Sequence, residues 1–219
     1  NTDFLELRAG GTGSYRWVGF NCADPLFTDP EVRKAIQMAD AFDGAIQAIF
    51  ANDAGIDLAV RAYSCIPYER PGGDTDGSAK AAARPYDTAA AEARLDELGW
   101  VKGSDGIRAK DGMKMSFTLQ VGNNDAAREK LAVIIASQFK AIGVDCTAKT
   151  SEWATHTTDI QNVNVQMYIL GGYSNLDGGL RLMHTDKESS SPNCNYSNPE
   201  VDALLDKAWV TIDTEARSA

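Results

Sequence analysis

The chain has 219 residues, 43% of them hydrophobic and 24% charged, which is the composition of a globular protein able to bury a core. No apolar run is long enough to span a bilayer. The formal net charge of -10 and the absence of any Lys/Arg cluster exclude a nucleic-acid partner, because neutralising phosphates requires clustered positive charge.

The first part of the chain is predicted to form a strand and then a helix. Residues 15–21 (YRWVGFN) have the composition of a buried strand. Asp29 before Pro30 fits an N-cap with proline at the first helical position. Apolar residues then follow at helical spacing: Val32, Ala35, Ile36, Ala39, Ile46, Ile49 and Phe50. Residues 51–66 are an ambiguous connection, and residues 66–80 form a loop rich in Pro, Gly and Asp.

The middle of the chain is predicted to alternate helix, strand and helix. A helix from about Asp87 ends at Gly99, a natural C-terminal stop. Strict alternation then indicates a half-buried strand, with these residues inward: Met113, Met115, Phe117, Leu119 and Val121. The next helix begins at about Asp125 and ends before Gly143, and its inward face is Leu131, Ile134, Ile135, Gln138, Phe139 and Ile142.

The last third is predicted to hold two more strands, over 144–150 and 163–170, with a helical or irregular stretch at SEWATHTTDI between them. A final helix starts with Asn198 as N-cap and Pro199 at N1. Its predicted inward face is Val201, Leu204, Leu205 and Ala208. Because strands alternate with helices, the fold class is α/β, with βαβ connections and a mixed sheet flanked by helices.

The chain begins at Asn1 without an initiator Met or a signal-peptide pattern, and it stops at ARSA just after a helical segment. We expect residues 1–219 to be a single lobe excised from a longer protein, since neither an internal repeat nor a convincing linker divides them.

Cysteine and histidine spacing offers no metal site. CxxC is absent, and His156 and His184 are distant in sequence from the cysteines. Cys146 alternates with its strand neighbours and is expected to be buried, whereas a disulfide among Cys22, Cys65 and Cys194 is an option if the protein is exported. His156 is expected at the surface. GxSxG and other nucleophile motifs are absent, so no catalytic residue and no cofactor are predicted.

The stretch GGYSNLDGG (171–179) follows an apolar strand but lacks both the GxGxxG spacing and the lysine of a phosphate loop. Glycines allow a ligand to approach the backbone closely. In open α/β sheets, ligands lie beyond the carboxyl ends of the strands. The stretch is therefore predicted to be a pocket wall, with an ordinary turn as the alternative.

Several segments, taken in order, resemble one family. They are YRWVGFN…PLFTDPEVRKAIQMADAFDGAI, YDTAAAEARLDELGW, G-x-R with its following strand, REKLAVIIASQFKAIGV, EWA, the apolar strand with its glycine loop, and NYSNPEVDALLDKA. Together they resemble the C-terminal lobe of family 5 extracytoplasmic solute-binding proteins, the dipeptide-, oligopeptide- and nickel-binding components of ABC importers.

This resemblance implies one lobe of a two-lobe protein with the type II periplasmic-binding fold, whose N-terminal lobe is missing from the chain. The implied function is capture of a small solute or oligopeptide outside the cytoplasmic membrane and delivery to ABC permease subunits, without bond breaking. The implied location is the periplasm or, for a lipoprotein, the outer face of that membrane.

The resemblance also implies site residues. In peptide binders of this family the glycine segment reads like G-W-x-x-D-Y, and its Asp pairs with the peptide's α-ammonium. The matching residues here are Gly172, Tyr173, Ser174, Asn175 and Leu176. A neutral amide at Asn175 gives a weaker hydrogen bond than a carboxylate, unless Asp177 substitutes for it. The identity of the solute therefore remains open, and the candidates include a blocked peptide, a sugar, a metal chelate or another solute.

Three further residues complete the implied ligand site. Trp153 matches the family's EW position and is expected to form an aromatic wall, although packing is an equal alternative. Gly171 opens the glycine loop, and Arg181 can meet a ligand carboxylate or form a structural ion pair. Two other functions remain open, an enzyme fragment such as a hydrolase and a sensor or adhesion module on the same fold.

Overall fold

The computed structural model describes residues 14–52, 58–64, 66, 76–173, 183–185, 195–213 and 216, with Tyr173 described in its backbone only. Its helices are α1 (Pro30–Gln37), α2 (Phe42–Phe50), α3 (Ser78–Ala82), α4 (Thr88–Glu97), α5 (Ala126–Ala141), α6 (Trp153–Gln161) and α8 (Pro199–Val210). Its strands are β1 (Ser14–Phe20), β2 (Val101–Lys102), β3 (Arg108–Lys110), β4 (Met113–Lys114), β5 (Ser116–Gly122), β6 (Asp145–Ser151) and β7 (Met167–Tyr173).

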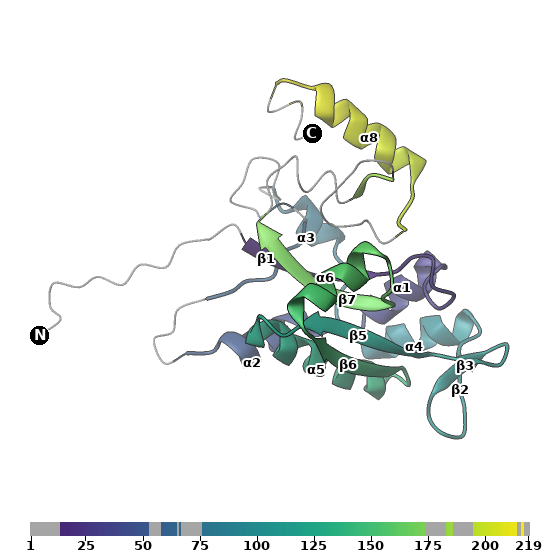
Figure 1. Cartoon of the computed structure of the whole chain (residues 1–219). Helices are drawn as coiled ribbons and strands as arrows, with labels where there is room; N and C mark the ends of the chain where they lie inside the picture. The colour runs from purple at the N-terminus through teal and green to yellow at the C-terminus, as the bar shows by residue number, and fades with distance from the viewer. Residues whose placement is uncertain are drawn as a thin grey trace, which may run out of the picture.

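The main sheet has the strand order β1-β7-β5-β6 (Figure 1). Strand β5 pairs in parallel with both β6 and β7, whereas β1 pairs antiparallel with β7. Strands β2, β3 and β4 form a separate small antiparallel sheet. The mixed sheet flanked by helices confirms the predicted α/β class.

Each face of the main sheet has its own hydrophobic cluster. Along β7, Met167 and Ile169 belong to the larger cluster, which includes residues of α1, α4 and α5. The alternate residues Tyr168 and Leu170 belong to a smaller cluster that contains Ile160 of α6 and is packed by Trp153. Successive side chains of a strand point to opposite faces, so α5 and α6 cover opposite sides of the sheet (Figure 1).

The helix starts agree with the sequence. The side chains of Asp29, Asp87, Asp125 and Asn198 each accept a hydrogen bond from a backbone amide in the first turn of the helix that follows. These bonds satisfy amides that have no partner within the helix. Gly99, with φ of +86°, ends α4 as predicted.

The helix expected to continue from Pro30 to Phe50 is in fact two helices, which corrects the sequence prediction. The amide of Ala41 donates to Oε1 of Gln138 on α5, 3.3 Å away, instead of continuing the helical ladder. The break between α1 and α2 holds Asp40, whose residue surface is only 3% exposed. Tertiary contact with α5 therefore overrides a continuous helical pattern.

Two strand predictions also need correction. The strand expected to begin at Met113 is divided, because β4 pairs with β3 in the small sheet, and Met113 is exposed. The strand expected over 163–170 begins at Met167 and continues to Tyr173. Val163 and Asn164 instead close α6, since their amides donate to the carbonyls of Ile160 and Asp159.

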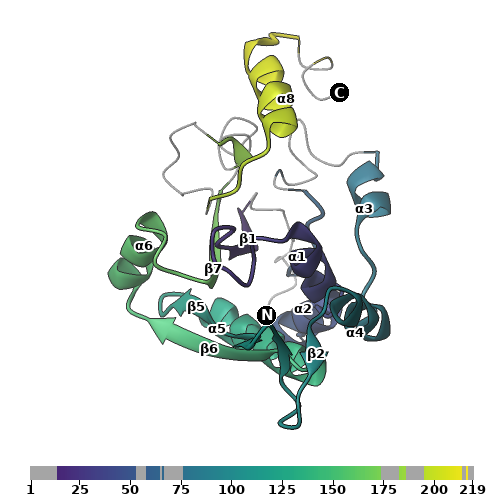
Figure 2. The ribbon, with the colours of Figure 1, turned by 90° about the vertical axis from the view of Figure 1, so that its right-hand side faces the viewer.

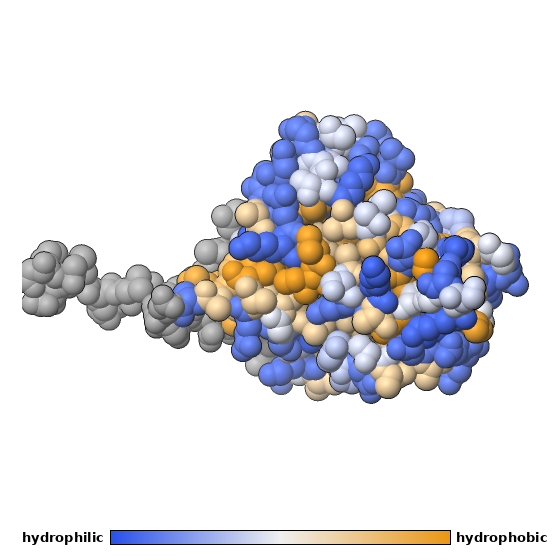
Figure 3. Space-filling model, turned by 90° about the horizontal axis from the view of Figure 1, so that it is seen from below, coloured by the Kyte–Doolittle hydropathy of each residue, from blue (hydrophilic) through white to orange (hydrophobic). Residues whose placement is uncertain are grey.

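Hydrophobic side chains also gather on the underside of the molecule, the side on which α2 and α5 lie (Figure 3). A groove of about 440 Å³ there is lined by Ala48, Ile49, Glu129, Lys130, Val133, Ile134, Ala148 and Thr150. At one end of the molecule, α8 stands away from the main sheet in two perpendicular views (Figures 1 and 2). None of the helices in the described ranges is long and apolar enough to cross a membrane.

Candidate functional site

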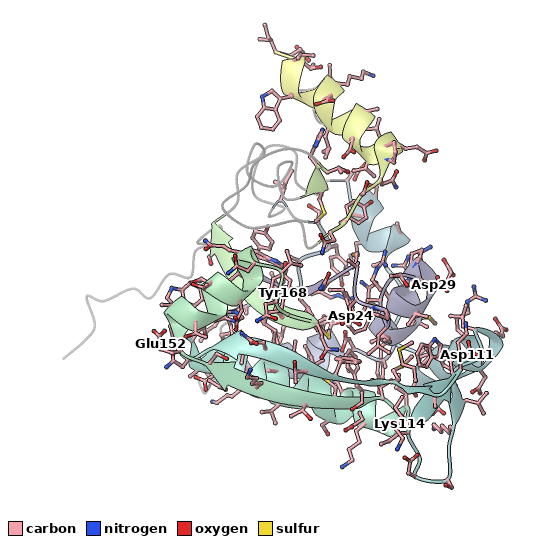
Figure 4. All side chains as sticks on the ribbon, turned by 45° about the vertical axis from the view of Figure 1, so that its right-hand side comes forward. Asp24, Asp29, Asp111, Lys114, Glu152 and Tyr168 are labelled. Carbon is pink, nitrogen blue, oxygen red and sulfur yellow. The ribbon has the colours of Figure 1, made fainter. Side chains whose placement is uncertain are left out.

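The candidate site lies at the edge of the main sheet where β5, β6 and β7 end. Because β1 runs antiparallel to β7, its first residues lie at this same edge, with Ser14 opposite Tyr173 and Arg16 opposite Gly171. The helices that follow β5 and β6 also begin here, with Asp125 and Glu152 as their N-caps. Glu152, the N-cap of α6, lies at the end of the molecule away from Asp111 and Lys114 (Figure 4).

Two arginines share one carboxylate at this edge. Arg16 donates to Oδ2 of Asp125 through Nε at 2.9 Å and through Nη2 at 2.6 Å. Nε of Arg128, in the first turn of α5, lies 3.2 Å from the same oxygen. The three side chains together carry one net positive charge. These three side chains offer a local positive charge, while Glu152 at the start of α6 brings a carboxylate to the same edge.

Arg128 is the side chain at this edge with unused donors. Only 12% of it is exposed, and its buried Nη1 and Nε atoms make no hydrogen bond within the part of the chain that the structure describes. A buried polar group without a partner costs free energy, and a ligand oxygen can supply that partner. Burial lowers the pKa of Arg128, against the charge of Asp125, which raises it.

Trp153 forms the aromatic side of the site. Its ring centroid lies 5.6 Å from the guanidinium carbon of Arg128 and 5.9 Å from the centroid of the His156 ring. A guanidinium at this distance from an indole is within the range of a cation–π interaction. Trp153 is half-buried and packs on the cluster beneath α6. Trp153 therefore packs against the smaller hydrophobic cluster, the alternative that the sequence left open, and it also lies at the edge of the sheet.

Two glycines make this close packing feasible. A Cβ added at Gly122 would lie 2.7 Å from Cε3 of Trp153 and 3.2 Å from Cδ2 of His156. A Cβ added at Gly171 would lie 2.9 Å from the carbonyl oxygen of Tyr15 and 3.2 Å from Nη2 of Arg128. Real Cβ atoms do not approach other atoms as closely as 2.7 Å. A side chain at either strand end would therefore push the neighbouring residues of the site out of position.

The electrostatic environment keeps Asp125 ionised. Burial raises the pKa of its carboxyl, but the hydrogen bond from Arg16, the amide of Arg128 and both guanidinium charges outweigh that effect and hold the pKa below its ordinary value. Asp125 also accepts from the amides of Ala127 and Arg128 as the N-cap of α5. It therefore anchors the helix and both arginines at once.

His156 is buried, with 0% of its surface exposed, which corrects its prediction as a surface residue. Its position in the first turns of α6, close to Trp153 and Gly122, points its ring into the sheet, where Nε2 lies 3.0 Å from the carbonyl oxygen of Ile169. Burial lowers the pKa of His156, so the neutral ring donates from Nε2.

The structure places the sequence-predicted site residues as follows. Trp153 and Gly171 both lie beside Arg128 at the candidate site, and Gly172 follows directly in β7. Gly171, Gly172 and Tyr173 are strand residues paired with β1, not part of a loop as expected. The remaining predicted residues lie outside the described ranges: Ser174, Asn175, Asp177 and Arg181.

Sequence reasoning missed Arg16, Asp125 as a charge partner, and Arg128. One signal was present, because Arg128 stands in the first turn of a helix. There the macrodipole disfavours a positive charge unless a carboxylate or another partner compensates it. The pairing of Arg16 with Asp125 joins residues distant in sequence and leaves no local pattern.

The other possible metal ligands and nucleophiles among the described residues do not form a second candidate site. Within the described part of the chain, no group of three or more His, Cys, Asp and Glu side chains can hold a metal ion. Cys146 is buried as predicted, and burial raises its thiol pKa to about 12. Cys22 is a free thiol, so it does not form the disulfide considered for it, and Cys65 and Cys194 lie outside the described ranges.

The mixed sheet with helices on both faces is the architecture of the type II periplasmic-binding proteins on which the chain superposes. Comparison with known proteins agrees: the model of "Bacterial extracellular solute-binding proteins, family 5 Middle" matches residues 2–192. The chain therefore belongs to family 5 of the bacterial extracellular solute-binding proteins.

Individual relatives support this assignment. The chain is 32% identical over 209 residues to Protein XP55 of Streptomyces lividans, covering 94% of the chain and 36% of that protein. It superposes on the oligopeptide-binding protein AppA of Bacillus subtilis, solved with a nonapeptide, with a TM-score of 0.84 at 26% identity, covering 94% and 40%. NikZ of Campylobacter jejuni, solved with Ni(L-His), gives 0.78 at 25% identity, covering 94% and 41%. The chain thus spans less than half the length of each.

Proposed function

We propose that the chain is one lobe of an ABC importer's solute-binding protein, which captures a peptide or peptide-like solute between two lobes and delivers it to membrane permease subunits. The bound solute is released unchanged, so the protein is not an enzyme. Its place is outside the cytoplasmic membrane, in the periplasm or as an anchored lipoprotein. Family membership and the peptide-bound relative support the proposal.

The main structural support for this proposal is the side chain of Arg128. Its unused N–H donors lie at the carboxyl end of the parallel strands, beside an aromatic ring and within a cluster of net positive charge. This arrangement suits a solute with a carboxylate and an adjacent apolar group, which an unblocked peptide provides. A charge-assisted hydrogen bond to Arg128 is stronger than a neutral one.

A non-peptide solute is the second candidate, and Asn175 favours it. The family resemblance implies an acid at that position in peptide binders, where this chain has an amide. A metal chelate is one such solute, since the relative NikZ was solved with Ni(L-His). Asn175→Asp in the full-length protein separates the two: a gain in affinity for free-amine peptides indicates a site otherwise shaped for peptides.

The direct test is native mass spectrometry of the full-length protein, purified without denaturation, followed by calorimetry with the solute found. Arg128→Ala is expected to weaken binding at least tenfold, about 1.4 kcal/mol. The matched control is Arg94→Ala, which removes an equally charged side chain from a surface ion pair with Glu31 and Glu97. Turnover of the solute, abolished by mutating a residue of this edge, would contradict the binding function.

A further inference from the structure

Arg16 and Arg128 approach the shared carboxylate of Asp125 differently. Arg16 donates to its Oδ2 through both Nε and Nη2, at 2.9 and 2.6 Å. Nε of Arg128 lies 3.2 Å from the same oxygen without the geometry of a hydrogen bond, and its buried Nη1 also makes none among the described residues. Asp125 is therefore paired mainly with Arg16, which leaves most of the Arg128 guanidinium available.

The position of Arg16 is fixed by the fold on two sides. In the pairing of β1 with β7 it stands opposite Gly171. A Cβ added at Gly171 would lie 3.1 Å from Cγ of Arg16 and 3.2 Å from Nη2 of Arg128, so both side chains pass the bare backbone of this glycine. The guanidinium carbon of Arg16 also lies 5.9 Å from the centre of the Phe50 ring, within the range of a cation–π contact. These contacts direct Arg16 at Asp125.

The second carboxylate at this edge has partners of its own. Oε2 of Glu152 accepts hydrogen bonds from the amides of Ala154 and Thr155, at 2.8 and 3.1 Å. Its charge thus compensates the positive end of α6. The charge that Arg128 retains therefore depends chiefly on how Asp125 is shared.

One carboxylate neutralises only one of two guanidiniums. Without Arg16, Asp125 and Arg128 would be left as a neutral pair three residues apart at the start of α5. We infer that Arg16 is a positioning residue, which holds Asp125 so that Arg128 keeps its charge and its outer N–H donors for the carboxylate of a solute. The inference rests on the proposed function and narrows the solute to one with a free carboxylate, in preference to the corresponding amide.

The test is calorimetry of the full-length protein with two probes, trileucine and its C-terminal amide, which differ only in the charge at the carboxyl end. The wild type is expected to prefer the acid. Arg16→Gln should reduce this preference about tenfold, by weakening binding of the acid alone. Arg16→Lys keeps the positive charge and should retain most of the preference.

The matched control is Arg94→Gln. Its side chain is 39% exposed, against 36% for Arg16, and it forms ion pairs with Glu31 and Glu97 far from this edge in the sequence. This variant should leave the preference unchanged. A purely structural role of Arg16 would weaken binding of both probes equally, and that result would overturn the inference.

Arg128→Ala separates failure of the inference from failure of the proposed function. If the wild type has no preference, or if Arg128→Ala leaves the preference intact, the proposed contact between Arg128 and a carboxylate is wrong. If Arg128→Ala removes the preference and Arg16→Gln does not, the inference alone is overturned.

A crystal structure of Arg16→Gln in the full-length protein gives a readout that needs no solute. Arg128 is expected to turn toward Asp125 and donate two hydrogen bonds to it, because a guanidinium and a carboxylate favour a two-point pair. An Arg128 side chain that keeps its position, with Nη1 still unpaired, would overturn the inference.

Discussion

The guanidinium of Arg128 lies over the ring of Trp153, 5.6 Å from its centroid, and so joins the first turns of α5 and α6. The two helices cover opposite faces of the main sheet, and this contact joins their first turns beyond the ends of β5 and β6. Arg128 is in turn paired with Asp125, which also holds Arg16 of β1. One contact therefore couples the aromatic wall of the candidate site to its charged cluster.

Loss of this ring should affect both stability and binding. Trp153→Leu keeps an apolar side chain but removes the cation–π contact and part of the packed area. We expect the free energy of unfolding to fall by about 1–2 kcal/mol, measured by urea denaturation. Solute affinity in the full-length protein should fall as well. An unchanged denaturation midpoint would show that the contact with Arg128 contributes nothing to stability.

Gly122 provides a sharper test of the same packing. Gly122→Ala places a methyl group 2.7 Å from Trp153, which must move, and overpacking of this kind costs about 1–3 kcal/mol. Gly172→Ala is the matched control, because its Cβ would meet nothing within 4 Å. Thermal unfolding and tryptophan fluorescence of the two variants should therefore differ. Similar changes in both would mean that Trp153 is not confined by Gly122.

Asp40 should make stability depend on pH. Burial raises the pKa of its carboxyl to about 8 from an ordinary value of 3.8, against the charge of Arg61, which lowers it. Between these values the folded state holds a proton that the unfolded state releases. The free energy of unfolding therefore decreases as the pH rises toward 8, by about 1.4 kcal/mol per pH unit.

Asp40→Asn replaces the carboxyl with a neutral group of the same shape and should remove this slope. Denaturation of both proteins between pH 6.5 and pH 8 should find the variant's advantage in stability growing with pH. Parallel curves would contradict the buried, protonated state of Asp40.

His156 acts in the opposite direction at lower pH. Burial lowers its pKa below the ordinary 6.5, so just below that pH the unfolded state binds a proton that the folded state does not. The contribution of His156 to the free energy of unfolding should therefore fall as the pH drops below about 6.5, against the opposite contribution of Asp40. His156→Gln retains a donor for the carbonyl of Ile169 and should lack this acid sensitivity in denaturation experiments. If the variant shows the same loss in acid, another group is responsible.

Local features of the fold were predictable from the sequence. The caps at Asp29, Asp87, Asp125 and Asn198 depend on residues within a few positions, and all four are observed. The alternating apolar residues of β5 likewise indicated which side chains enter the core. These predictions succeed because a cap or an alternation is determined by neighbours along the chain.

Features set by distant contacts were not predictable. The helix break at Asp40 depends on Gln138, and β7 extends through Gly171 because β1 supplies an antiparallel partner. His156 follows a polar stretch in the sequence and gives no sign of burial. In the candidate site, Trp153 and Gly171 were predicted, whereas Arg16 and Arg128 were missed because their shared carboxylate is a tertiary contact.

The central claim is that solute is held between this edge and a second lobe, and calorimetry with the full-length protein and the 219-residue chain tests it most directly. A micromolar solute requires about 8 kcal/mol of binding free energy. If this lobe supplies half of the contacts, about 4 kcal/mol remains, which corresponds to millimolar binding at best. We predict micromolar or tighter binding by the full-length protein and almost none by the chain alone. Submicromolar binding by the chain alone would contradict the two-lobe account.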